Sequence, residues 1–233
     1  NVANGLVGYW HFDNLSSAGE NSTHVYDWSG LGNNGTVSGS SWISGGYYNG
    51  AYDFDGDGGN DDYIIVQDSP LWDFSGSFAI SAWIRTDANP SGLDGIVTRS
   101  TSSPYVWYLR FNSGNLQWAI DQDEVAYGWV PTIGTWHHIV AVWNGTDRII
   151  YVDGDFKVSE AEAGAPTANA DAVYIGMDYQ PGNSRTFPGS IDEVMIFNRS
   201  LSADEIIELY IKGRTLWNFT DYQNITGNGT DSG

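Results

Sequence analysis

Two segments near the ends of this chain each read as a β-strand with an acidic residue at its edge. Residues 5–13 spell GLVGYWHFD, and residues 187–202 spell FPGSIDEVMIFNRSLS. Between them, clusters of Gly, Asn, Asp and Ser divide the chain into short apolar runs at the spacing typical of β-sandwiches. The sequence therefore predicts an all-β chain that folds as two antiparallel sheets packed face to face.

Two runs indicate the centre of this sandwich. Residues 78–85 (FAISAWIR) and 136–143 (WHHIVAVW) are apolar enough to be central strands covered on both faces. Two hairpins are also indicated, one with residues 112–115 (NSGN) at its turn and one with Asp153-Gly154, a pair that favours a tight turn with positive φ.

One helix is predicted near the end of the chain. Ser202 and Glu205 have the S-x-x-E spacing of a capping box. The apolar stripe behind them is Ile206, Ile207, Leu209 and Tyr210. We expect this helix to pack against one end of the sandwich. The sequence therefore divides into a sandwich domain over 1–212 and a polar tail or linker over 213–233, although Trp217 and Phe219 could dock back on the domain.

Composition limits the classes of function. The chain has no Cys, which excludes disulfides and thiolate metal sites. Its net charge of −20, with only two lysines, argues against nucleic acid or an anionic membrane as partner. No apolar run approaches the ~18 residues of a membrane span. The acid excess fits a salt-adapted protein and an ordinary acidic secreted domain equally well.

Glycosylation sequons suggest the compartment. Eight N-x-Ser/Thr motifs occur, and three of them fall within the last sixteen residues. The sequence predicts an exported, glycosylated cell-surface protein, part of a larger chain. The candidate attachment sites are Asn144, Asn218, Asn224 and Asn228.

Seven motifs in order carry a family resemblance. They are the two terminal segments, AYDFDG at 51–56, DYIIV at 62–66, FAISAWI at 78–84, WHHIVA at 136–141 and IYVDG at 150–154. Together they resemble laminin-G-like domains, jelly rolls of the concanavalin A-like lectin and glucanase type. The resemblance implies first and last strands that pair, in two sheets of roughly six or seven strands. It implies no single function, since relatives bind glycans, mediate adhesion or accompany enzymes as accessory modules.

The resemblance also implies a structural calcium ion. Calcium takes six to eight oxygens from carboxylates, backbone carbonyls and water. By similarity, the side-chain ligands are Asp13 and Asp192, and the carbonyls come from Asn33 or Gly35. The alternative is that Asp13 caps a turn, while Asp27 closes an Asx-turn with Ser29 and is not a ligand.

One further group is a weaker metal candidate, and the histidine pair is not one. Asp53, Asp55 and Asp57 echo a calcium loop, but position twelve is Ile64 instead of the Glu that an EF-hand requires. A loosely bound cation and a plain acidic surface loop stay open there. The adjacent His137 and His138 point to opposite faces of a strand and cannot chelate one ion, so we expect them to be packed and hydrogen-bonded.

Catalysis is not indicated. The paired-carboxylate motifs of glucanases, E-x-D-x-E and E-x-D-x-x-E, do not occur, and neither does a G-x-S-x-G elbow. We therefore expect no hydrolase activity. An enzyme would require two carboxylates ~5 to 10 Å apart in a cleft.

Aromatic residues suggest a glycan surface instead. Sugars stack on aromatic faces while polar side chains bind their hydroxyls. The candidates at loops and strand ends are Tyr105, Trp107, Tyr127, Trp129, Tyr179 and Arg185; the alternative for each is packing. The prediction is a calcium-stabilised lectin-like module that binds carbohydrate or a cell-surface glycoprotein, or mediates adhesion. The rivals are a spacer domain and a glycoside hydrolase.

Overall fold

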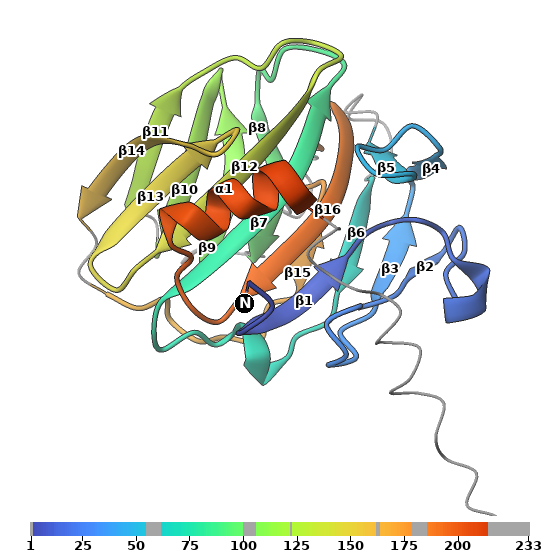
Figure 1. The fold of residues 1–233 in the computed structure, drawn as a ribbon, viewed down its shortest axis with the longest axis horizontal. Helices are drawn as coiled ribbons and strands as arrows, with labels where there is room; N and C mark the ends of the chain where they lie inside the picture. The colour runs from blue at the N-terminus through green and yellow to red at the C-terminus, as the bar shows by residue number, and fades with distance from the viewer. Residues whose placement is uncertain are drawn as a thin grey trace, which may run out of the picture.

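A computed structural model describes residues 2–54, 62–99, 106–121, 123–161, 164–178 and 186–213. Two antiparallel sheets of eight strands each pack face to face, and one α-helix lies on the outside (Figure 1). The predicted fold class is confirmed, although the sheets have more strands than expected. Several predicted residues lie outside the described ranges: Asp55, Asp57, Tyr105, Tyr179, Arg185, Asn218, Asn224, Asn228 and the tail from 214 onward.

The sheet that carries the helix is called sheet A. Its order is β14 (Asp155–Ala161), β13 (Asp147–Val152), β12 (Trp136–Trp143), β7 (Phe78–Thr86), β16 (Gly189–Phe197), β5 (Ala51–Phe54) and β4 (Ser41–Ile43), and β1 (Leu6–Trp10) also pairs with β16. The predicted pairing of the first and last strands is therefore confirmed.

The opposite sheet is called sheet B. Its order is β11 (Asp123–Gly128), β10 (Asn115–Ile120), β9 (Trp107–Asn112), β8 (Leu93–Arg99), β15 (Val173–Ile175), β6 (Tyr63–Val66), β3 (Gly35–Ser38) and β2 (His24–Val25). Two short 3₁₀ turns, η1 (Ser16–Ala18) and η2 (Pro70–Trp72), lie in the connections. The short motifs at β5 and β6 thus contribute to different sheets.

Alternation along the strands separates two apolar layers. In β7, Phe78, Ile80, Ala82 and Ile84 join the main core between the sheets, while Ala79 joins a second cluster between sheet A and the helix. Because both faces of β7 and β12 are covered, their sequences are apolar throughout, as predicted.

The helix α1 (Ala203–Lys212) begins with the predicted capping box, in which Ser202 accepts from the Glu205 amide. Its buried residues are Ile206 and Leu209, whereas Ile207 is 42 % exposed. α1 lies across the outer face of sheet A and not at the end of the sandwich (Figure 1). That position follows from its short connection to β16, which returns the chain over the same sheet.

Both predicted hairpins form. Asp153 and Gly154 have φ of 54° and 81°, the positive values of a type I′ turn, and Ser113 and Gly114 have 50° and 80°. The second turn joins β9 to β10 in full register, from Asn112 opposite Asn115 to Trp107 opposite Ile120. This register places Gln117 opposite Arg110 on the outer face of sheet B.

Two strands share one edge of β16. β7 pairs with the other edge, so β5 (opposite residues 189–191) and β1 (opposite residues 194–197) meet end to end along β16. Asp192 and Glu193 lie where they meet, at an irregularity with Glu193 at φ 53°. Figure 1 shows β5 and β1 on the same side of β16.

Candidate binding sites

The junction of β5 and β1 brings the two predicted calcium ligands to one loop. Asp192 is fully buried, and its carboxylate accepts from the amides of Tyr48 at 3.0 Å and Glu193 at 2.8 Å. Asp13 accepts from the Gly50 amide at 3.4 Å and from Asn49 Nδ2 at 3.3 Å. The loop at residues 44–50, between β4 and β5, therefore contacts both carboxylates.

This loop also places a backbone oxygen and an Asp192 oxygen around Gly46. A Cβ atom at Gly46 would overlap the carbonyl oxygen of Gly50 and lie 3.0 Å from Asp192 Oδ2, so both oxygens converge on Gly46. Carboxylate and carbonyl oxygens are the ligands that calcium prefers. Among the residues that the structure describes, no group of three or more His, Asp or Glu side chains could hold a metal, so a cation here would depend on carbonyls and water.

The predicted carbonyl ligands, Asn33 and Gly35, have protein partners. The Asn33 carbonyl accepts from Trp10 Nε1 at 2.9 Å, and its side chain donates to the Val7 carbonyl. Gly35 is part of β3, paired with Val25 and Val66. Loop 44–50 is the backbone that donates to the two carboxylates, and the carbonyls of Asn33 and Gly35 stay predicted ligands.

Asp27 is saturated by hydrogen bonds. It accepts from the amides of Tyr9, Ser29 and Asn33 and from the Ser29 hydroxyl, at 2.8 to 3.0 Å. The Asx-turn with Ser29 is confirmed. Four donors already surround this buried carboxylate. Its role is therefore to hold β1 against the turn that begins at Asp27.

The weaker metal candidates have protein partners. Asp53 Oδ1 accepts from the Ser190 hydroxyl at 2.8 Å. His137 and His138 point to opposite faces, as predicted: His137 Nδ1 lies 2.8 Å from Asp153, and His138 Nε2 lies 2.8 Å from the Ser81 hydroxyl. Burial lowers the pKa of His138 to about 4, which keeps the ring neutral beneath α1.

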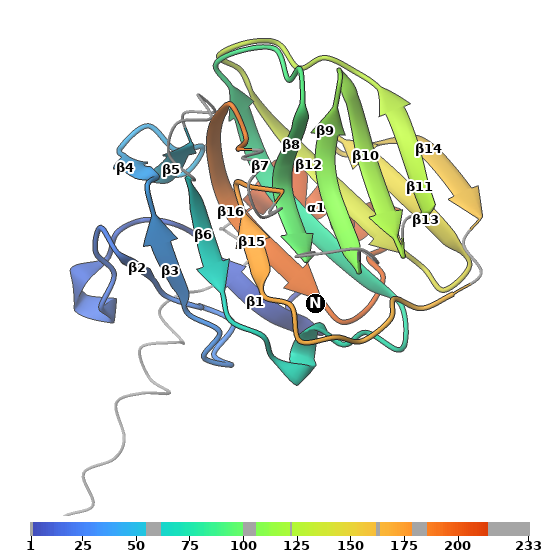
Figure 2. The same cartoon turned by 180° about the vertical axis from the view of Figure 1, so that it is seen from behind.

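The outer face of sheet B carries a different kind of site, a chain of polar side chains. Arg110 donates to Asp178 at 2.6 Å and to Gln117 at 3.1 Å. Gln117 in turn donates to Glu124 at 2.6 Å, and the Tyr108 hydroxyl donates to the same carboxylate at 3.0 Å. We call these five residues the sheet B network. No helix covers this face in the part of the chain that the structure describes (Figure 2).

The sheet B network is buried except at one end. Tyr108, Arg110 and Gln117 are 3 to 6 % exposed and Asp178 is fully buried, whereas Glu124 is exposed. The Arg110 guanidinium stacks 3.7 Å above the Tyr108 ring. Burial raises the pKa of the Tyr108 phenol, and Arg110 offsets part of that rise, so the hydroxyl stays a donor.

Asp178 is placed by close backbone contacts. A side chain on Gly95 would overlap the backbone of Met177 and Asp178, so the glycine lets this segment lie directly on β8. Thr98 fixes the same segment by donating to the Met177 carbonyl at 2.9 Å. Asp178 therefore reaches Arg110 from 68 positions along the chain.

The aromatic glycan candidates in the described ranges face the interior. Trp107 has no exposed surface and belongs to the core, because it alternates with Tyr108 along β9; the expectation that it contacts a ligand is corrected. Tyr127 and Trp129 are half-buried, stack with ring centres 6.5 Å apart, and pack against the core. They line the margin of the sandwich.

The sheet B network is absent from the residues predicted from the sequence. Its signal was the period of two in the hairpin at 107–120: once Trp107, Leu109 and Phe111 are assigned to the core, Tyr108 and Arg110 must face outward.

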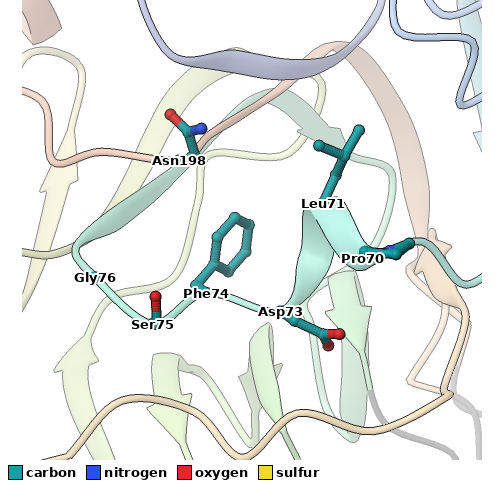
Figure 3. Close-up of a pocket in the computed structure, with 7 residues that line it drawn as sticks. All are labelled: Pro70, Leu71, Asp73, Phe74, Ser75, Gly76 and Asn198. Atoms are coloured by element: carbon teal, nitrogen blue, oxygen red, sulfur yellow. The ribbon is translucent and has the colours of Figure 1, made fainter.

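One hollow is formed elsewhere. η2 and the turn into β7 surround about 220 Å³, with Asn198 on one side (Figure 3). Its side chains already serve the fold: Asp73 pairs with the buried Arg99 at 2.9 Å, and Phe74 stacks on Phe78. This hollow offers little chemistry for recognition.

Comparison with known proteins agrees with the architecture. The sequence model of the Laminin_G_3 family, the concanavalin A-like lectin/glucanases superfamily, matches residues 57–207. Fold and sequence together define a lectin-like β-sandwich. The chain belongs to the Laminin_G_3 family. No curated protein sequence matches it.

Solved structures of binding domains share the fold. The binding domain of Paraclostridial Mosquitocidal Protein 1 matches with a TM-score of 0.69 at 21 % identity, over 90 % of this chain and 52 % of that one. The binding domain of botulinum neurotoxin DC, solved in complex with SialylT, matches with 0.68 at 14 %, over 94 % and 53 %. This chain therefore spans about half the length of these toxin domains.

A smaller module is matched along almost its whole length. Domain 4 of AbnA, a GH43 extracellular arabinanase from Geobacillus stearothermophilus, was solved in complex with arabinotriose. It matches with a TM-score of 0.65 at 16 % identity, over 88 % of this chain and 98 % of that one.

α1, with ten residues, is too short to cross a bilayer. No helix in the described ranges is long and apolar enough to span a membrane.

Proposed function

We propose that this chain is a carbohydrate-binding module whose ligand contacts the outer face of sheet B at the sheet B network. The observation that carries the proposal is that charged and amide side chains are buried and hydrogen-bonded on a sheet face that no described helix covers. Two solved structures with a similar fold, domain 4 of AbnA with arabinotriose and the botulinum neurotoxin DC binding domain with SialylT, support carbohydrate as the ligand class.

The chemistry of the network suits sugars. Glu124 is exposed and accepts hydrogen bonds from both Gln117 and Tyr108, which fix its orientation before any ligand arrives. Each carboxylate oxygen retains capacity to accept from a sugar hydroxyl. A preorganised acceptor loses less side-chain freedom on binding than a mobile one.

Glu124→Ala tests this assignment. We expect it to abolish binding of oligosaccharides that the wild type retains on a glycan array, and to lower the free energy of unfolding by about 1–3 kcal/mol because the buried donors Gln117 and Tyr108 lose their acceptor. The matched control is Asp204→Ala on α1, which also removes an exposed carboxylate. Equal binding by Glu124→Ala and wild type would contradict the assignment.

We also propose that calcium closes the junction of β5 and β1. Asp13, Asp192 and the carbonyls of loop 44–50 would hold it, and the ion would neutralise the two carboxylates there. An ion that binds only the folded chain stabilises it. EDTA should therefore lower the melting temperature by several degrees, and Asp192→Asn should remove that dependence. Identical melts with EDTA and with calcium would contradict the proposal.

The module is further proposed to be exported, non-catalytic and glycosylated. Asn144 is exposed, and its Oδ1 accepts from the Thr146 amide and hydroxyl, each at 2.9 Å, so the sequon lies in an open turn. In the sheet B network both carboxylates are engaged by donors, which favours binding over acid–base chemistry. Release of reducing ends from an oligosaccharide that binds would contradict the non-catalytic assignment.

A further inference from the structure

The sheet B network has one cation, and that cation is enclosed. Arg110 donates to Asp178 through Nη1 and to Gln117 through Nε, and its flat face rests on the Tyr108 ring at 3.7 Å. The residue is only 6 % exposed. A guanidinium with a buried carboxylate partner at 2.6 Å has its charge already compensated, which weakens its attraction for a second anion.

The group that the network presents to solvent has the opposite sign. Glu124 is exposed, whereas Tyr108, Gln117 and Arg110 lie beneath it. An ionised carboxylate only accepts hydrogen bonds, so it is complementary to hydroxyl donors and opposes a ligand carboxylate. The net charge of −20 adds repulsion of the same sign over the whole surface.

We infer that the site takes neutral saccharides, whose hydroxyls donate to Glu124, and discriminates against sialylated and uronic-acid sugars. This inference rests on the proposed function. The inference concerns the charge of the ligand. The fold does not determine that charge, because domains with the same fold can carry different side chains at this surface.

Matched pairs of probes test the inference. Lactose is compared with 3′-sialyllactose, and galactotriose with trigalacturonic acid, by calorimetric titration at 50 mM NaCl. We expect at least one neutral probe to bind and its acidic counterpart to bind about 10-fold or more weakly, since like charges that face each other oppose association. Raising NaCl to 0.5 M should reduce the difference in affinity between the neutral and the acidic probe.

A charge variant separates repulsion from shape. Glu124→Gln keeps the volume and removes the charge, so it should narrow the ratio between acidic and neutral probes by about 10-fold. Asp204→Asn on α1 removes the same charge from the other face of the molecule and should leave the ratio unchanged.

The outcomes are distinguishable. Acidic probes that bind as tightly as neutral ones would overturn the charge inference and leave the proposed function standing. If Glu124→Gln and the wild type show the same ratio of acidic-probe to neutral-probe dissociation constants, the charge inference is likewise overturned. Failure of every neutral and acidic probe to bind would overturn the proposed function, and the inference with it.

Discussion

The two outer faces of this sandwich bury polar groups in different ways. On sheet A, α1 covers an apolar layer, and the polar side chains buried against that layer include Ser81 with His138 and Tyr9 with Glu193. On sheet B, five polar side chains form one connected network that ends at the exposed Glu124.

This difference indicates two roles. The face under α1 is explained by packing, because apolar contacts supply its stability and each polar group has a local partner. The sheet B network is not explained that way, because a buried ion pair contributes little net stability compared with apolar residues of the same volume. A connected polar network on an outer sheet face is what recognition of a polar ligand would require.

The largest expected effect is on the sheet A face. Trp83 is 3 % exposed and stacks between Tyr47 and Tyr210, so Trp83→Ala should lower the free energy of unfolding by about 3–5 kcal/mol. Urea denaturation measures it. Sugar binding by the folded variant should be unchanged; loss of binding would show that the two faces are not independent.

The second test separates stability from function on sheet B. Arg110→Met should lower the free energy of unfolding by about 3 kcal/mol, because it leaves the buried Asp178 without its cation. Adding Asp178→Leu should recover most of that loss, since two apolar residues can fill the same volume. Urea melts and sugar titration are then compared.

The double variant decides between the two roles. If the sheet B network serves recognition, Arg110→Met with Asp178→Leu should be nearly as stable as wild type and should bind sugar more weakly, because Gln117, which orients Glu124, loses its donor Arg110. A double variant that binds normally would show that the ion pair only fills space.

A smaller effect appears with pH on the sheet A face. Burial lowers the pKa of His138 from 6.5 to about 4, so between these values the unfolded chain holds a proton that the folded chain does not. This contribution to stability is therefore present above pH 6.5 and is lost as pH falls toward 4, by at most about 1.4 kcal/mol per pH unit.

His138→Gln checks that effect. The variant keeps an amide near the Ser81 hydroxyl and removes the titration, so its stability should fall less steeply between pH 6.5 and 4. Parallel slopes for variant and wild type, from urea melts at each pH, would exclude His138 as the source. Sugar binding should follow neither slope.

The fold could be predicted because its signals are local. Asp153-Gly154 determines a turn, Ser202 and Glu205 cap a helix, and the apolar runs at β7 and β12 predict strands with both faces covered. Asp13 and Asp192 could be predicted to lie close together because the terminal strands pair. The register of that pairing then places both residues at the same end of the two strands.

The sites could be predicted only in part, because their partners come from distant segments. Loop 44–50 reaches Asp192 from 144 positions away, and only its glycines at 45, 46 and 50 marked it as backbone that packs closely. Tyr108 and Gln117 could have been assigned to the outer face from their alternation with core residues. Asp178 could not, because no local pattern predicts that its segment folds over Gly95.

The most direct test of the central claim is to map where a neutral sugar binds by nuclear magnetic resonance. Titration with the neutral oligosaccharide that binds most tightly should shift the side-chain amide signals of Gln117 and the backbone signals of β9, β10 and β11, while α1 and β7 stay unchanged. Shifts confined to α1 and sheet A would contradict the account.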